Sequence, residues 1–243
     1  MVLETHLQAL LEPRADVLAA WLGGSAASGR TDEHSDVDLV AIAANDAVEA
    51  VLAAIEGALP IALRLALPMP TWHGHAQRLY RVAGKLLDVV IMREDAPNRF
   101  LEPERHGTPV VLFDKPGLVR PAPLDPVAWH AKLRERVAYL VPSFDLLQEL
   151  PRKAALRGLP MDAMGSYQTY TIRPLVELCR IKHCPWKYDF GLRYLERDLP
   201  ADLHARLIAL CYVADPADIL AKLPVAEALF QEVLAGMDCS LAG

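Results

Sequence analysis

Apolar and polar positions follow two different patterns along the chain. In the first half, short apolar runs of strand length are separated by turn residues and by two stretches with helical spacing. The helical spacing predicts helices over 3–12 and 46–59. The apolar runs predict strands over 17–22, 37–43, 61–67, 76–82, 85–92 and 109–113. The first half is therefore expected to be a mixed sheet with flanking helices.

The pattern changes near residue 120. Three prolines between 120 and 126 indicate a linker. Beyond it the hydrophobic spacing is helical throughout and predicts helices over 127–150, 162–184, 188–197, 201–213 and 223–236. We therefore expect an α+β protein with two domains, a mixed sheet domain over 1–120 and an all-helical domain over 121–243.

Composition narrows the class of protein. The 243 residues are 53% hydrophobic, enough for real cores, and the formal net charge of −6 comes without a cluster of Lys and Arg. A long nucleic acid is therefore not an expected partner. We expect neither a membrane span nor a signal peptide, and the four cysteines lack a CxxC spacing. These features predict a cytoplasmic protein with reduced thiols. The sequence leaves open whether the protein is a monomer or a homodimer.

Two carboxylates follow a turn of small residues and form the centre of the candidate site. Asp36 and Asp38 flank Val37 at the start of a predicted strand, so their side chains share one face. Two carboxylates at that spacing repel each other unless a cation lies between them, and carboxylate oxygens are ligands that Mg²⁺ prefers. Asp88 is the one charge inside another apolar run and supplies a third carboxylate. The alternative is that Asp36 caps a turn and Asp88 marks a strand edge.

The turn before these carboxylates has the chemistry of a phosphate site. Gly23 and Gly24 permit a close backbone approach, and Ser25 follows where a helix could begin. Such a turn alone is a weak signal. Arg30 is either a phosphate ligand beside the turn or a solvated loop cation.

The combination of these residues is more specific than any of its parts. Gly24 and Ser25, then Gly29 and the segment 35–39, resemble the signature of the DNA polymerase β-like nucleotidyltransferase superfamily, with Asp88 where that pattern has its third carboxylate. The resemblance implies a small mixed nucleotidyltransferase sheet and transfer of a nucleoside monophosphate from a nucleoside triphosphate to a hydroxyl, with release of pyrophosphate.

The resemblance also assigns roles. It implies that Asp36 and Asp38 hold two Mg²⁺ ions, that Asp88 completes the second metal site and accepts the proton of the acceptor hydroxyl, and that Gly24, Ser25 and Ser35 contact the triphosphate. Chemistry of this kind is mostly positioning and charge neutralisation.

The helical half resembles the antibiotic nucleotidyltransferases that modify streptomycin and kanamycin. On that resemblance Arg180 and Lys187 are candidates to reach the nucleotide phosphates, and Tyr212 is a candidate to lie near the base. The alternative for Arg180 is an ordinary helix surface with Glu177 as its partner.

The expected activity is Mg²⁺-dependent transfer of AMP from ATP to a hydroxyl of a small molecule. An aminoglycoside-like antibiotic is one candidate acceptor, which would make the protein an antibiotic-resistance enzyme. Two alternatives stay open. The acceptor could be a protein or a tRNA end, or the chain could be a nucleotide-binding, antitoxin-like regulatory module without catalysis.

Overall fold

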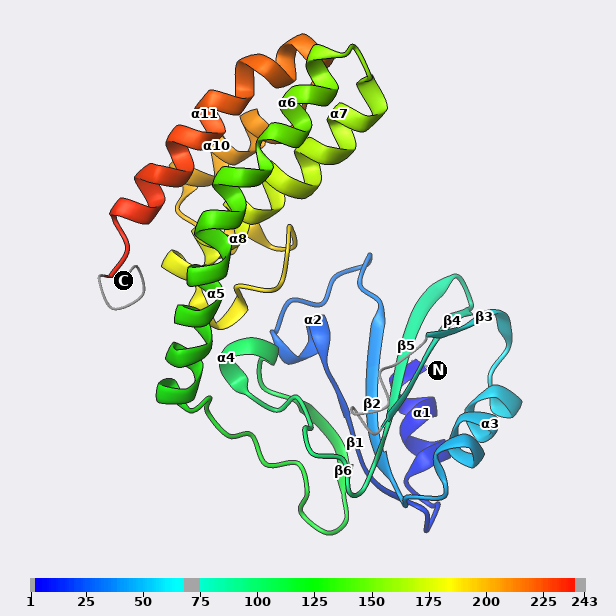
Figure 1. Ribbon diagram of the computed structural model, residues 1–243. Helices are drawn as coiled ribbons and strands as arrows, with labels where there is room; N and C mark the ends of the chain where they lie inside the picture. Colours follow the sequence, from blue (N-terminus) through cyan, green and yellow to red (C-terminus); the bar gives the residue numbers. More distant parts are fainter. Residues whose placement is uncertain (1–2, 68–74, 239–243) are drawn as a thin grey trace. The chain divides into compact units, whose positions relative to one another are not determined.

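The chain divides into two compact units, residues 1–124 and 125–243. The structure, a computed structural model, describes residues 3–67 and 75–238 (Figure 1). We call residues 1–124 the sheet unit and residues 125–243 the helical unit. The division lies a few residues beyond the expected boundary at 120. The helical unit begins where it does because the Asp125 carboxylate accepts hydrogen bonds from the backbone N–H groups of Val127, at 2.9 Å, and Ala128, at 3.3 Å.

One sheet of six strands organises the sheet unit, in the order β3-β4-β5-β2-β1-β6. Parallel pairing joins β2 to β5, and all the other neighbours are antiparallel. The strands are β1 (Val17–Leu22), β2 (Val37–Ala43), β3 (Ile61–Leu67), β4 (His75–Val82), β5 (Lys85–Arg93) and β6 (Val110–Asp114).

The two faces of this sheet have different surroundings. Helices α1 (Leu3–Leu11) and α3 (Val48–Ala58) pack on one face, over a core that includes Leu39, Leu87 and Val89. On the opposite face a second, smaller core around Trp21, Ile42 and Met92 is covered by the segment that carries α4 (Pro103–His106). The short helix α2 (Gly24–Ala27) follows β1 directly. The strands β3 and β4 lie beyond this second core, at the end of the sheet where β3 is the edge strand.

The helical unit has a single continuous core. Its centre includes Phe144 and Phe230, whose rings stack with centroids 3.8 Å apart. Among the described residues no helix has the length and apolar character needed to cross a membrane. The elements are α5 (Pro126–Leu147), α6 (Glu149–Leu156), α7 (Pro160–Tyr167), η2 (Gln168–Ile172), α8 (Arg173–His183), η3 (Pro185–Lys187), α9 (Leu195–Asp198), α10 (Ala201–Cys211) and α11 (Pro216–Ala235).

The expected fold class, α+β with a mixed sheet followed by helices, is confirmed. All of the strands predicted from apolar runs are present within a residue or two of their expected ends. The helix predicted over 188–197 is wrong, because only Leu195–Asp198 is helical. Gly191 and Tyr194 have positive φ angles of 61° and 62°, and the carbonyls of Gly191 and Arg193 accept hydrogen bonds from the Arg180 side chain rather than from a helical N–H. The cysteines Cys179, Cys184 and Cys211 are free thiols, and Cys239 lies outside the described residues.

Candidate active site

Three carboxylates lie on the sheet face opposite α1 and α3. Asp38 is the second residue of β2, and the parallel register with β5 makes Asp88 its direct neighbour. Asp36 stands two residues before Asp38, immediately ahead of the strand, so its side chain leaves on the same side. Strand pairing thus brings together residues from two stretches of chain that are fifty positions apart in the sequence (38 and 88).

The surroundings of Asp88 destabilise the ionised form of its carboxyl group relative to the protonated form. Burial raises the pKa of the Asp88 carboxyl above its ordinary value, and the negative charge of Asp36 raises it further, whereas a hydrogen bond from Gln77 lowers it. The influence of Asp36 shows that the two carboxylates are near enough to repel each other. A carboxyl group with a raised pKa takes up a proton readily, and a bound cation can neutralise its negative charge instead.

Gln77 holds Asp88 in place. Its Nε2 amide group donates to both carboxylate oxygens of Asp88, each at 2.9 Å. Gln77 lies in β4 directly opposite Val90, so it reaches Asp88 across the diagonal of the antiparallel pair. The bond fixes the direction of the Asp88 carboxylate.

The turn between β1 and α2 lies directly against Asp38. The N–H of Gly23 donates to the Asp38 carbonyl at 2.9 Å. Gly24 has a φ angle of +51°, and a Cβ atom there would lie 1.7 Å from Oδ2 of Asp38. No residue other than glycine can stand at this position without moving Asp38. Ser25 is the next residue, in the first turn of the short helix α2.

Ser35 and Arg30 lie on the loop that connects α2 to β2. The hydroxyl of Ser35 donates to Oδ1 of Asp32 at 2.9 Å and accepts from the Asp32 N–H at 2.9 Å. Both of its hydrogen-bonding functions are used inside the loop, so a phosphate contact would have to displace Asp32. Arg30 is exposed, and its backbone N–H donates to the Ser25 carbonyl at 2.9 Å, which closes the turn. Its exposure suits a phosphate ligand and a solvated cation equally.

The donor set suits a divalent cation by its chemistry. Asp36, Asp38 and Asp88 offer only carboxylate oxygens, which are the ligands that Mg²⁺ takes from proteins. As the side chains lie, no three His, Cys, Asp or Glu groups within 3–67 and 75–238 enclose a position for a metal ion. Nε2 of Gln77 stands in front of both Asp88 oxygens, where a cation would stand against a bidentate carboxylate. A cation bound there would neutralise the negative charges of Asp36 and Asp88, which repel each other.

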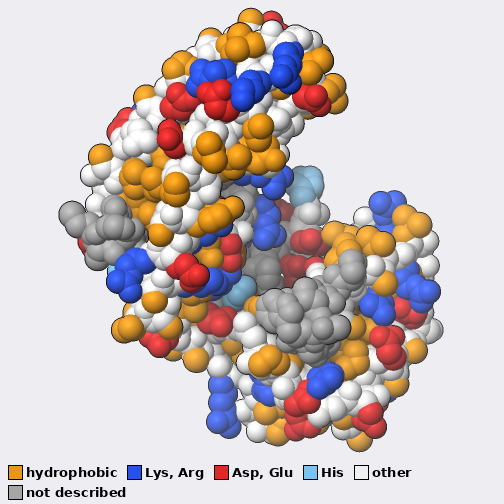
Figure 2. Space-filling model, viewed as in Figure 1, with side chains coloured by type: hydrophobic (Ala, Val, Ile, Leu, Met, Phe, Trp, Pro, Cys, Tyr) orange, Lys and Arg blue, Asp and Glu red, His pale blue; other side chains and the backbone are white. Residues whose placement is uncertain are grey.

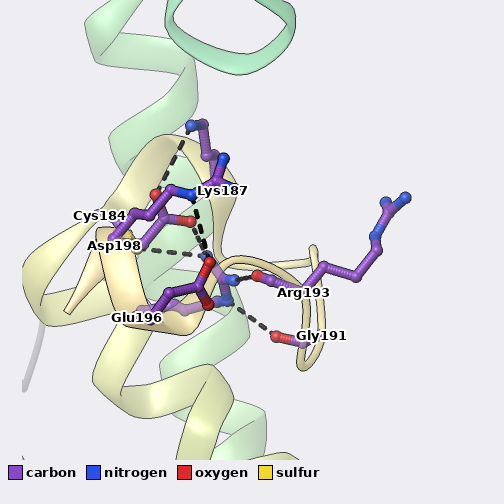
Figure 3. Close-up of polar contacts among 8 residues, drawn as sticks. Cys184, Lys187, Gly191, Arg193, Glu196 and Asp198 are labelled. Carbon is purple, nitrogen blue, oxygen red and sulfur yellow. Dashed lines mark hydrogen bonds and ion pairs between the residues drawn. The ribbon is translucent and has the colours of Figure 1, made fainter. Parts of the chain in front are cut away.

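In the helical unit, Arg180 is enclosed. Its side chain is 0% exposed, and the guanidinium donates to the carbonyls of Gly191, at 2.9 Å, and Arg193, and to the Asp198 carboxylate, at 2.7 Å (Figure 3). The placement corrects the expectation that Arg180 contacts nucleotide phosphates. Its donors instead hold the segment 191–198 against α8, and its partner is not the alternative Glu177, which pairs with Arg136 at 2.5 Å.

Lys187 and Tyr212 are the remaining candidates of the helical unit. Nζ of Lys187 lies 3.7 Å from Oδ1 of Asp198, and its side chain is 27% exposed (Figure 3). Tyr212 follows the last residue of α10 and is 78% exposed. Both side chains reach the surface of the unit and remain candidates for a ligand contact.

Sequence reasoning missed Gln77. Its signal lay in the predicted hairpin, because counting back from the turn at Ala83 and Gly84 pairs Leu79 with Asp88. The residue two positions before Leu79 then falls diagonally opposite Asp88. A polar residue at that point of a strand was the available indication.

Comparisons with known proteins give remote likenesses. No protein-family model matches the sequence, and no curated protein sequence matches it. Among solved structures, the chain is similar to an aminoglycoside 6-adenyltransferase from Bacillus subtilis, with 11% identity and a TM-score of 0.36 over 95% of this chain and 86% of that one. It is also similar to a nucleotidyltransferase-like protein from Exiguobacterium sibiricum, with 12% identity and a TM-score of 0.42 over 95% of this chain and 75% of that one. Likenesses at these values carry no argument, so the case for function rests on the residues of this chain.

Proposed function

We propose that the chain is a Mg²⁺-dependent nucleotidyltransferase that moves a nucleoside monophosphate, AMP from ATP in the first instance, to a hydroxyl of a small molecule. The observation that carries the proposal is the juxtaposition of Asp38 and Asp88 on neighbouring parallel strands, with Gly24 packed against Asp38. A glycine turn beside clustered carboxylates joins a place for phosphate to a place for divalent metal.

Each residue of the site has a task in such a transfer. The acceptor oxygen would attack the α-phosphorus, the bond from that phosphorus to the bridging oxygen would break, and pyrophosphate would leave. Asp88 would accept the hydroxyl proton on a carboxylate oxygen, which suits its raised pKa. Gln77 would keep that carboxylate directed, and the glycine at position 24 lets the Asp38 carboxylate lie directly against the turn that would hold the triphosphate.

Asp36 and Asp38 would hold Mg²⁺, with Asp88 as the third ligand where two ions bind. The metal, when bound, supplies neutralisation of the charge that develops on the phosphate oxygens. Ser25, Ser35, Arg30, Lys187 and Tyr212 are proposed nucleotide contacts of lower rank. Arg180 is removed from that set because its donors are satisfied inside the helical unit.

Pyrophosphate release tests the proposal directly. The full chain is incubated with Mg²⁺, each of the four common nucleoside triphosphates and a panel of hydroxylated acceptors, and pyrophosphate is measured by a coupled phosphate assay. Asp38→Asn is expected to lower the rate about a hundredfold or more, because the metal loses a ligand while the shape is kept. Asp46→Asn is the matched control, an exposed aspartate that follows the other end of β2.

The results separate the alternatives. ATP binding without turnover on any acceptor would favour a regulatory module, whereas turnover only with protein or tRNA would change the acceptor class. Pyrophosphate release that is the same in wild type and Asp38→Asn would refute the proposed site.

A further inference from the structure

The register of the sheet extends the row that contains the carboxylates. Asp88 in β5 pairs with Leu79 in β4, and Leu79 pairs with Leu65 in β3. With Asp38 as the neighbour of Asp88, one row therefore runs across four strands as Asp38, Asp88, Leu79 and Leu65. Residues of one row share a face of the sheet, so the two leucines continue the surface that carries the carboxylates.

The next row along the strands has the same character. Leu86 in β5 pairs with Arg81 in β4, and Arg81 pairs with Leu63 in β3. Leu86 stands two residues before Asp88 in the same strand and so shares its face. We call Leu63, Leu65, Leu79 and Leu86 the leucine platform.

The leucine platform does not belong to a core. Leu63 is 58% exposed, Leu65 is 56% exposed and Leu86 is 44% exposed. The helices pack on the opposite face, where Arg64 of β3 pairs with Glu56 of α3. Figure 2 shows hydrophobic side chains gathered near the tip of the β4–β5 hairpin, beside acidic ones. Large apolar side chains grouped at the surface next to reactive groups indicate a binding surface.

We propose that the leucine platform binds the apolar body of the hydroxyl acceptor, and that the acceptor is an alcohol or phenol without ammonium groups. The inference rests on the proposed function. With strands about 4.8 Å apart, Leu65 lies about 10 Å from Asp88, which fits a body as long as an eight-carbon chain. The acceptor would lie across β4 and β5 with its hydroxyl at Asp88.

The charge within the leucine platform argues against placing the ammonium groups of a polycationic acceptor, such as an aminoglycoside, on it. Arg81 lies between Leu86 and Leu63 and is exposed, so it would repel ammonium groups placed on the platform. No residue of the two rows outside the carboxylate end is acidic. A neutral apolar alcohol meets no such cost and covers leucine surface that is otherwise in water.

The first test compares acceptors on the wild-type chain. Pyrophosphate release from Mg²⁺ and ATP is measured with 1-octanol, with 4-butylphenol and with kanamycin. The alcohol and the phenol are expected to give kcat/KM at least about tenfold above kanamycin. Turnover with kanamycin alone would overturn the inference and leave the proposed function standing. No pyrophosphate release with any acceptor, together with no binding of Mg²⁺ and ATP by calorimetry, would overturn the proposed function and the inference with it.

The second test uses a matched pair of substitutions on β3. Leu65→Glu puts a charge on the platform and is expected to raise KM for 1-octanol about tenfold, while Ala66→Glu puts the same charge on the opposite face of the same edge strand and is expected to leave KM unchanged. Circular dichroism and thermal melting check that both variants fold. Equal KM values in the two variants would overturn the inference. Conversion of a dimer to a monomer by Leu65→Glu, seen by light scattering, would also overturn it, because the platform would then be a subunit interface.

Discussion

Charged residues have different roles in the two units. In the sheet unit, Asp36, Asp38 and Asp88 lie on one face of the sheet, and burial and the negative charge of Asp36 raise the pKa of the Asp88 carboxyl. In the helical unit, Arg180 is fully buried, and each nitrogen of its guanidinium donates to a carbonyl or to Asp198. The first arrangement destabilises the ionised form of Asp88, whereas the second uses the charge of Arg180 to hold the segment 191–198 against α8.

The difference teaches how a lone charge in an apolar stretch should be understood. Asp88 and Arg180 both interrupt hydrophobic sequence, and both were candidates for function. What separates them is the number of partners within the fold. Among the residues that the structure describes, Asp88 has one hydrogen-bond donor, Gln77, and a like charge nearby. Arg180 has a partner for each nitrogen of its guanidinium.

Removal of Arg180 is the largest expected effect on stability. Arg180→Met should lower the free energy of unfolding by about 3–5 kcal/mol, because the Asp198 carboxylate, whose side chain is 9% exposed, and the carbonyls of Gly191 and Arg193 lose the donors of Arg180. Urea denaturation followed by circular dichroism measures this change. Arg206→Met is the control, since Arg206 forms a two-point pair with Glu232 in which the side chains are 45% and 59% exposed, and such pairs contribute about 0–1 kcal/mol. Similar losses in the two variants would contradict the conclusion that the buried contacts of Arg180 stabilise the helical unit more than an exposed ion pair does.

The strands, most of the helices and the proximity of Asp38 to Asp88 follow from local sequence pattern, whereas the contacts of Arg180 and the role of Gln77 do not. Apolar runs and the Ala83-Gly84 turn were enough to place β4 and β5, and with them Asp88. The burial and the partners of Arg180 depend on the segment 191–198 folding back onto α8. Arg180 and Asp198 are 18 positions apart in the sequence, so local spacing does not reveal their contact. Helical spacing over 188–197 was overridden by those contacts. To predict that Gln77 contacts Asp88, one needs the register of the β4–β5 hairpin. The sequence pattern determines that register only after the turn residues are identified.

A substitution at Gly24 tests whether the close contact between the turn and Asp38 is required. Gly24→Ala should lower pyrophosphate release about a hundredfold, because the new Cβ would stand 1.7 Å from Oδ2 of Asp38 and displace the carboxylate. Gly29→Ala is the matched control: it too has a positive φ, of +66°, but a Cβ there would meet nothing within 4 Å. It should cost about 1 kcal/mol of stability from backbone strain alone and leave the rate per folded molecule intact. Equal rates in the two variants would mean that Asp38 is not held by the turn.

Gln77 gives the next test, because within 3–67 and 75–238 it is the one residue that donates a hydrogen bond to the Asp88 side chain. Gln77→Leu should lower kcat about tenfold, because the Asp88 carboxylate loses its direction. The hydrogen bond from Gln77 lowers the pKa of Asp88, so its loss raises that pKa. Asp88 must be ionised to accept a proton, and therefore the acid limb of the pH–rate profile should move to higher pH.

A double substitution checks the route of this effect. In an Asp88→Asn background, Gln77→Leu should change kcat little further, since both substitutions remove one function. Independent losses that multiply would show that Gln77 acts elsewhere in the site.

Lys187 carries the smallest expected effect and tests whether the helical unit offers any free charge. Its Nζ lies 3.7 Å from Oδ1 of Asp198, whose other oxygen, Oδ2, accepts from Arg180, and the Lys187 side chain is partly exposed. Lys187→Ala should therefore leave the thermal midpoint unchanged within about 2 °C. If Lys187 contacts the nucleotide, the Kd for ATP measured by calorimetry should rise about fivefold, which corresponds to about 1 kcal/mol. Lys153→Ala, at a lysine on α6 that is 58% exposed and 4.0 Å from Glu149, is the control for loss of one positive charge in the same unit. An unchanged Kd in Lys187→Ala would remove Lys187 from the proposed nucleotide contacts and leave the phosphate contacts to residues of the sheet unit and to Tyr212.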